Sequence, residues 1–481
     1  MKRFTITTIL ITSVIALSVS TVGWFYLNRY LAKTDLLALG VTYSESSFVK
    51  TVCDDNTVAS LLFIKSGMDI NTKAEGNLTA LHCAAQHGNV DLIKAFIDKK
   101  ADINAKTDNP HSQLLTPLHM AIKSRKMDSV NLLLNAGADI NANSPQGTPL
   151  FIAATYGNND QVITLINHGA NVKITDKWGN TALHAAVNNS NPEVIIDTLI
   201  SNGVDVNAKG KDKQTALHLA VTARNNVLVE KLIEHSADVN AVSDSGTPLL
   251  IAYNNNIITE TLLANKADPN ITDNNGTTPL IYSAKSKDNT VSNMLLEAGA
   301  NVNVTTKSND TPLIVAVKHC NLDLTGTLIK KGANTRVCCN KSTPLHTSVV
   351  YNKNCNSLQM ITLLLIAGSD INARDEAGRT PLIEARYAPL AIVEKLVSSG
   401  ANINEKDNLG VSVLKWYQHA KQSPALDFLT SKIATSTATT QPTVKEQPTI
   451  QELLTTREES MRQVQEIRGK YKHQSETYKK Q

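Results

Sequence analysis

The hexapeptides Thr181-Ala182-Leu183-His184-Ala185-Ala186 and Thr215-Ala216-Leu217-His218-Leu219-Ala220 indicate the fold of this chain most directly. Each begins with a tetrad of Thr, then Pro or Ala, then Leu, then a fourth residue. Tetrads start roughly 31 to 37 residues apart, at Thr79, Thr116, Thr148, Thr181, Thr215, Thr247, Thr278, Thr311, Thr343 and Thr380. A repeat of this length predicts a stack of similar units and not one large core.

A second pattern alternates with the tetrad and has the same period. Gly137-Ala138-Asp139-Ile140-Asn141 and Gly400-Ala401-Asn402-Ile403-Asn404 are examples. Its third residue is always Asp or Asn, at positions Asp69, Asp102, Asp139, Asn171, Asp205, Asp238, Asp268, Asn301, Asn334, Asp370 and Asn402. Two independent patterns with one period make chance agreement negligible.

With both patterns, residues 44–430 closely resemble the ankyrin family. The resemblance implies an all-α solenoid of about eleven helix-turn-helix units, each with a β-turn finger. It also implies that the histidine in fourth place of several tetrads is structural, bonding to backbone between neighbouring units. These residues are His82, His119, His184, His218 and His346. Apolar residues replace histidine in the other tetrads, which argues against a metal site.

The residue types fit such a unit. The tetrad Thr can cap the first helix through its hydroxyl, and Pro suits the first helical position because no donor is lost there. Glycine favours the left-handed position that ends a helix. We therefore expect second helices to end at Gly137, Gly169, Gly203, Gly299, Gly332, Gly368 and Gly400.

The ends of the array depart from the repeat pattern. Residues 44–71 lack a clear tetrad and residues 409–431 keep a degenerate one, so both are predicted to be caps. Residues 431–448 are a low-complexity linker. Residues 449–481 are charged and are predicted to form a helical tail, either a solvated helix or one that pairs with a partner.

The N-terminal segment, residues 1–34, contains no charged residue between Arg3 and Arg29. Residues 4–28 are long enough to span a bilayer as a helix, and Trp24, Phe25 and Tyr26 cluster at its far end. One interpretation is a single-pass membrane anchor with the repeats on the non-cytoplasmic side. The other is a signal peptide cleaved after Ser18-Val19-Ser20, which would release a secreted protein.

Composition and motifs exclude several functions. A net charge of +4 over 481 residues does not indicate a basic surface for binding nucleic acid. The sequence contains none of the phosphate-loop, nucleophile-elbow, zinc-protease or kinase motifs, so we expect neither an enzyme, nor a cofactor, nor a small-molecule substrate. Four cysteines crowd one region without metal-ligand spacing, and we expect no metal there: Cys320, Cys338, Cys339 and Cys355.

Function is therefore expected to reside on the surface of the solenoid, as protein binding. The candidate contact residues are fingers or helix ends: Tyr156, Lys177, Trp178, Lys211, Lys213, Arg374 and Arg379. Aromatic and arginine side chains are common binding anchors. An equally plain interpretation is that Trp178 packs on the next finger and that the lysines are only solvated. The main hypothesis is a membrane-tethered interaction scaffold; the alternatives are a secreted effector that binds host proteins and an envelope spacer.

Overall fold

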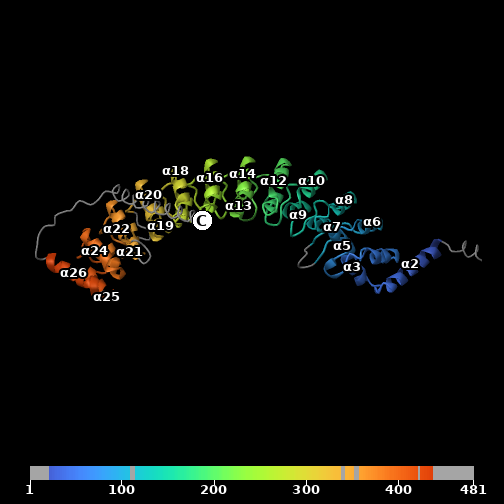
Figure 1. Cartoon of the computed structure of the whole chain (residues 1–481), viewed down its shortest axis with the longest axis horizontal. Helices are drawn as coiled ribbons and strands as arrows, with labels where there is room; N and C mark the ends of the chain where they lie inside the picture. The colour runs from blue at the N-terminus through green and yellow to red at the C-terminus, as the bar shows by residue number, and fades with distance from the viewer. Residues whose placement is uncertain (1–20, 109–113, 337–341, 352–356, 421–422, 437–481) are drawn as a thin grey trace, which may run out of the picture. The chain divides into compact units, whose positions relative to one another are not determined.

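The computed structural model describes residues 21–108, 114–336, 342–351, 357–420 and 423–436. Contacts divide the chain into two compact units, residues 1–244 and 245–481. Each unit is built from helix pairs, and no β-strand occurs in the described residues beyond three isolated bridges (Figure 1). The all-helical repeat fold predicted from the sequence is confirmed.

Unit 1 begins with a long helix, α2 (Thr21–Ala38), followed by six helix pairs. The first helices of these pairs are α3 (Glu45–Cys53), α5 (Ala80–His87), α7 (Pro117–Lys123), α9 (Pro149–Tyr156), α11 (Ala182–Ala186) and α13 (Ala216–Thr222). The second helices are α4 (Thr57–Lys65), α6 (Val90–Asp98), α8 (Met127–Asn135), α10 (Asn159–Asn167), α12 (Pro192–Ser201) and α14 (Asn226–Glu234).

Unit 2 repeats this order through six further pairs. Its first helices are α15 (Pro248–Ile251), α17 (Pro279–Ser283), α19 (Pro312–Lys318), α21 (Pro344–Val350), α23 (Pro381–Glu384) and α25 (Val413–Ala420). Its second helices are α16 (Asn256–Ala264), α18 (Thr290–Glu297), α20 (Leu322–Lys330), α22 (Ser357–Ile366), α24 (Leu390–Ser398) and α26 (Ser423–Ser436). The last helix of the pairs thus ends inside the predicted linker.

The core of each unit lies between successive pairs, because first helices pack on first helices and second helices on second helices. The tetrad leucines fill it and are at most 2% exposed: Leu81, Leu118, Leu150, Leu183, Leu217, Leu249, Leu280, Leu313, Leu345 and Leu382. Buried alanines beside them, such as Ala186, let adjacent helices approach closely. The core is therefore a series of thin layers and not one central volume.

The predicted glycine stops are confirmed. All seven glycines named above have φ between 83° and 100°, the left-handed region that side chains with a Cβ adopt at a cost. The pair that contains the degenerate tetrad packs on the preceding pair: Tyr417 of α25 is buried, and its hydroxyl donates to the Leu382 carbonyl at 2.9 Å.

Residues 44–71 form a complete helix pair, α3 and α4, although they lack the tetrad. Ser44 takes over the role of the tetrad Thr, since its hydroxyl accepts the Ser47 N–H at 3.1 Å. Helix α2 then packs on α4 in the place of a preceding unit. The N-terminal cap is therefore α2 together with this pair.

No helix in the described part of the chain is both long and apolar enough to cross a membrane. Most of the predicted span, residues 4–20, lies outside the described residues. The predicted tail at residues 449–481 lies outside them as well.

Candidate functional site

The fingers are held by histidines at the start of the first helices. Nδ1 of His184 accepts the Thr181 N–H at 3.2 Å, and its Nε2 lies 3.0 Å from the Gln214 carbonyl in the next finger. One imidazole thus caps its own helix and bonds to the following unit. His82 and His346 repeat the arrangement with the carbonyls of Leu115 and Arg379. The structural role implied by the family resemblance is confirmed for these three histidines.

Burial keeps these histidines neutral. It lowers the pKa of His82 and of His119 from 6.5 to about 4. Burial also lowers the pKa of His184 and His346. Because Nδ1 of His82, His184 and His346 accepts a hydrogen bond from the backbone, the neutral tautomer with a proton on Nε2 satisfies both partners of each ring.

The second sequence pattern has two structural roles. Its Asp or Asn folds the backbone locally: Oδ1 of Asp102 accepts the N–H of Asn104 at 3.0 Å. The Asn two residues later reaches across units, and Asn104 Oδ1 accepts the Asp139 N–H at 2.8 Å. We call these inter-unit bonds the asparagine ladder. Its acceptors are Asn71, Asn104, Asn141 and Asn207 in unit 1, and Asn270, Asn303 and Asn372 in unit 2.

The ladder is interrupted at Lys173 in unit 1 and at Arg336 in unit 2, which stand where the other units place Asn. Asn171 Oδ1 still accepts the Lys173 N–H at 3.0 Å, so the local turn is kept. A lysine side chain has no acceptor, however, and it cannot take the N–H of the next unit. Lys173 therefore does not make the inter-unit bond, and it places an exposed positive charge at this finger.

The finger that follows Lys173 projects Trp178. Asp176 is buried, and its Oδ1 accepts the N–H groups of Trp178 and Asn180, both at 2.8 Å. This tight turn leaves the Trp178 side chain 50% exposed. Lys177 Nζ lies 4.2 Å from the centre of the indole ring, a cation–π contact.

The next finger, η2 (Lys211–Lys213), lies beside the first. Asn180 Oδ1 accepts the Lys211 N–H at 3.0 Å, which joins the two fingers. Asp212 and Lys213 have φ of 55° and 58°, so the backbone at this tip is in the left-handed region. Lys213 pairs with Asp244 at 2.9 Å, and both side chains are more than half exposed, so the pair adds little stability.

These two fingers form one surface, which we call the finger patch. It consists of Lys173, Lys177, Trp178, Lys209, Lys211 and Lys213, all of them exposed. The structure therefore brings together four of the seven predicted contact residues. Lys173 and Lys209 were not predicted. Lys173 lies one period before Asn207, and Lys209 lies two residues before Lys211; this spacing was a signal that could have identified them.

The other three candidates lie elsewhere. Tyr156 is at the C-terminal end of α9, where Lys123 Nζ lies 5.7 Å from its ring and Arg125 donates to its carbonyl. Arg374 and Arg379 belong to unit 2. Arg374 pairs with Glu405 at 2.6 Å, and Arg379 pairs with Asp375 and Glu384 at 2.9 and 2.7 Å. These arginines hold neighbouring segments of the fold together.

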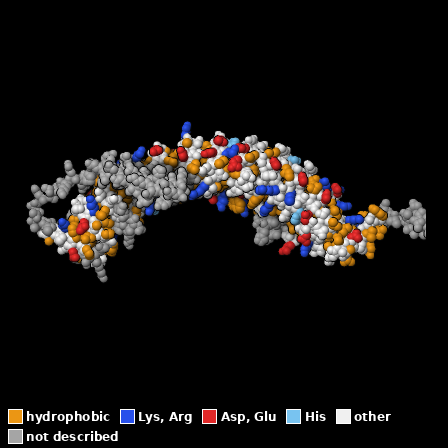
Figure 2. All heavy atoms as spheres, in the orientation of Figure 1, with side chains coloured by type: hydrophobic (Ala, Val, Ile, Leu, Met, Phe, Trp, Pro, Cys, Tyr) orange, Lys and Arg blue, Asp and Glu red, His pale blue; other side chains and the backbone are white. Residues whose placement is uncertain are grey.

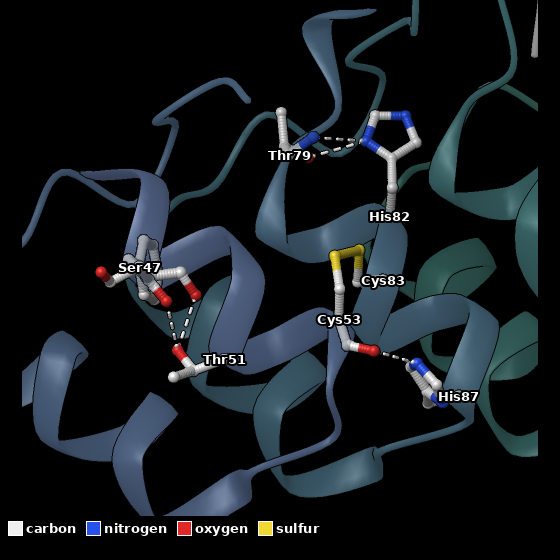
Figure 3. Close-up of a disulfide and its surroundings, with 8 residues drawn as sticks. Ser47, Thr51, Cys53, Thr79, His82, Cys83 and His87 are labelled. Atoms are coloured by element: carbon white, nitrogen blue, oxygen red, sulfur yellow. Dashed lines mark hydrogen bonds between the residues drawn. A yellow bond between two sulfur atoms is a disulfide. The ribbon is translucent and has the colours of Figure 1, made fainter. Parts of the chain in front are cut away.

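Sequence reasoning also missed a disulfide between Cys53 of α3 and Cys83 of α5, whose Cα atoms are 4.8 Å apart (Figure 3). His87 Nε2 lies beside it, 2.8 Å from the Cys53 carbonyl. The separation of 30 residues, close to one period, was the available signal. Cys320 also belongs to a disulfide, and the remaining cysteines, Cys338, Cys339 and Cys355, lie outside the described residues.

Comparisons with known proteins agree with this architecture. A family model for ankyrin repeats in three copies matches overlapping segments, residues 49–144, 150–243, 188–273, 220–306, 249–338, 291–375 and 327–407. The chain is 32% identical over 82 residues to the NF-kappa-B inhibitor cactus of Drosophila yakuba, covering 17% of this chain and 16% of cactus. It is 30% identical over 92 residues to the dauer abnormal formation protein 25 of Caenorhabditis elegans, covering 19% and 23%.

These relatives are matched over less than a quarter of their own length, so they carry information about the repeat and not about a whole protein. The family model, in contrast, covers well over half of this chain. This extent of match settles the family, and the tetrads, the buried histidines and the successive helix pairs agree with it. The chain belongs to the ankyrin-repeat family.

Proposed function

We propose that this chain is a non-catalytic scaffold that binds another protein, and that the finger patch of unit 1 is its contact surface. The observation that carries the proposal is the finger patch itself: an exposed indole with Lys177 against its ring, and four further exposed lysines on the same two joined fingers. Aromatic side chains are frequent anchors of protein interfaces. The positive charges favour a partner surface that is acidic around an apolar recess.

Two features support a functional origin of this surface. Partly buried hydrogen bonds from Asp176 fix the backbone at Trp178 before binding, so less conformational entropy is lost when this finger is contacted. Lys173 adds a positive charge at a ladder position, where its side chain cannot accept the inter-unit bond, as is also the case for Arg336 in unit 2.

The relatives are consistent with a protein partner. Cactus is named for inhibiting NF-kappa-B, another protein. The similarity covers only a small part of either chain and does not transfer that partner. It does favour the same class of activity, which is recognition of a macromolecule through the repeat surface.

The test is charge reversal within the finger patch. The variant Lys177→Glu/Lys211→Glu and a control, Lys94→Glu, would be purified from cells that express the full chain, and co-purifying proteins compared by mass spectrometry. Lys94 is exposed on α6, away from the fingers. We expect a partner present with the wild type and the control to be lost with the double variant. Retention of every partner by the double variant would refute the finger patch as the contact surface.

We further propose that residues 4–28 tether the chain to a membrane, with the repeats on the non-cytoplasmic side. The uncharged stretch before Arg29 supports the tether. The Cys53–Cys83 disulfide supports the orientation, because disulfides persist in oxidising compartments and are rare in the cytosol.

Two alternatives share the same repeat surface: a secreted effector, and an envelope spacer that docks through residues 449–481. Cell fractionation with mass spectrometry of the N-terminus separates the first from the tether. An intact N-terminus in the carbonate-resistant membrane fraction is expected, and a soluble chain that begins near Thr21 would overturn the tether. Loss of binding on deletion of residues 449–481 alone would favour the spacer.

A further inference from the structure

The first half of α2 exposes bulky apolar side chains around its whole circumference. Trp24, Phe25, Tyr26 and Leu27 are 64%, 52%, 65% and 51% exposed. Consecutive helical residues are about 100° apart, so four of them surround the axis. Figure 2 shows hydrophobic side chains gathered at this end of the molecule. The exposed apolar surface of residues 24–27 is therefore a collar around the helix, and Tyr30 and Leu31, 66% and 45% exposed, extend it by one turn.

The second half of the same helix is attached to the repeats. Ala32 and Leu36 are fully buried, and α2 packs on α4. Arg29 Nη2 donates to the Gly67 carbonyl at 3.4 Å, and Lys33 Nζ lies 4.3 Å from the centre of the Tyr43 ring. This half of α2 closes the open side of the first helix pair.

Gly67 is specific to this attachment. A Cβ at Gly67 would overlap the guanidinium of Arg29. At the equivalent glycines of later units, such as Gly137 and Gly169, a Cβ would meet nothing within 4 Å. The first unit is thus the one in which the glycine that ends the second helix also makes room for α2.

The two halves form one helix. α2 runs without interruption from Thr21 to Ala38, with neither Gly nor Pro after Gly23. At about 1.5 Å per residue, the collar lies roughly 15 Å along the axis from the buried Leu36. A straight helix therefore connects the exposed collar to the cap of the repeats.

A lipid bilayer interface is the environment that suits the collar. A groove on a protein partner would cover one side of the helix and leave the opposite side chains in water. A bilayer surrounds a helix on all sides, and Trp and Tyr favour its interface. The uncharged residues 4–23 lead directly into the collar, and the cations Arg29, Lys33 and Lys65 follow it, as expected beside anionic headgroups.

We propose that residues 24–27 lie in the interface of a bilayer and that α2 continues as one unbroken helix from this interface into the N-terminal cap of unit 1. The inference rests on the membrane tether proposed above and goes beyond it. The continuous helix then holds the first repeats at the membrane surface, and no flexible linker separates them from the bilayer. The surface near Arg29, Lys33 and Lys65 faces the headgroups.

The test is depth-dependent fluorescence quenching of single tryptophans in the full-length chain. Trp178 and Trp416 are replaced by Phe, which leaves Trp24 as the probe. A matched variant in the same background carries Trp24→Phe and Leu37→Trp. Leu37 is 74% exposed on the same helix, roughly 20 Å from Trp24 along the axis. Both proteins are reconstituted into phosphatidylcholine–phosphatidylglycerol vesicles that contain lipids brominated at the upper acyl chain.

We expect the emission of Trp24 to fall at least about twofold and that of the Leu37→Trp variant to stay unchanged. Quenching of both probes would overturn the inference, because α2 would then lie flat on the bilayer. A membrane-bound protein with neither probe quenched would also overturn it and would place the collar against protein, such as a second copy of this chain. Failure of the full-length chain to associate with vesicles would remove the tether and the inference together.

Discussion

Single buried histidines make the stability of this array sensitive to acid. In the folded state the pKa of His82 is about 4, against 6.5 when the ring is exposed. The unfolded chain therefore binds more protons between these two values. The stabilising contribution is complete above pH 6.5 and is lost as the pH falls towards 4. At pH 5 the loss is about 2 kcal/mol for each such histidine.

Replacing His82 by Gln tests this account. Gln can keep the reciprocal hydrogen bonds of the cap but does not titrate. We expect urea unfolding monitored by circular dichroism to show a stability at pH 7.5 that is about 1 kcal/mol lower, from the lost bond to Leu115. Between pH 7.5 and 5, the variant should lose about 2 kcal/mol less than the wild type. Equal losses in both proteins would show that His82 is not held neutral.

The gap in the asparagine ladder at Lys173 gives a second prediction at residue scale. Lys173→Asn restores an acceptor for the next unit, and we expect it to raise the free energy of unfolding by about 1 kcal/mol. The matched change Asn141→Ala removes an existing bond of 2.9 Å and should lower it by a similar amount. If Lys173 also contacts the partner, Lys173→Asn should weaken binding while stabilising the fold. A destabilised Lys173→Asn variant would contradict the ladder.

The residue scale is also where sequence reasoning was most complete. The tetrads and the glycine stops follow from backbone capping, which is local and leaves a mark in every unit. The ladder was missed because its bonds join residues about one period apart, and its regular Asn carried no chemical signal on its own. The family resemblance indicated the inter-unit bonds of the histidines, and the sequence alone did not.

At the scale of elements, the residues that end the second helices differ in the steric cost of their left-handed backbone conformation. Ser236 follows α14 with φ of 66°, where most units place glycine. Ser236→Gly should stabilise the protein by about 1 kcal/mol, because glycine adopts this conformation without a steric penalty. Urea denaturation measures the change. Gly203→Ser is the converse variant, and with φ of 89° it should be destabilising. A stabilised Gly203→Ser would refute the argument.

The disulfide joins the first helices of the first two pairs (Figure 3). It closes a 30-residue separation, for which loop entropy predicts about 3 to 4 kcal/mol of stabilisation. We expect the variant Cys53→Ala/Cys83→Ala to exchange its α3–α6 amides with deuterium faster than the wild type under oxidising conditions. Exchange in unit 2 should be unchanged. Equal protection of α3–α6 in both proteins would contradict a stabilising role.

Elements that depend on packing between units were harder to predict than those fixed by local sequence. The pair α3–α4 lacks the tetrad, and Ser44 supplies the cap in its place. The sequence of residues 24–38 resembles a membrane flank, and nothing in it indicated that Ala32 and Leu36 would be buried on α4. Which cysteines pair likewise depends on which helices the stack brings together.

At the scale of the whole molecule, we propose a non-catalytic repeat array whose binding residues gather in the finger patch of unit 1. The sequence predicted the solenoid and four of the six residues of the finger patch. Lys173 and Lys209 were not selected from the sequence, because exposed lysines are common and their spacing gains meaning only once the two fingers are known to be joined. The membrane tether stays a prediction, since residues 4–20 lie outside the described part of the chain.

Site-specific photo-crosslinking in cells that express the full chain tests the central claim most directly. A photoreactive amino acid is placed at position 178 and, as a control, at position 227, because Val227 on α14 is 57% exposed and lies outside the finger patch. We predict a discrete covalent adduct with another protein from position 178 and none from position 227. No adduct from position 178, or equal adducts from both positions, would contradict the finger patch as the binding surface.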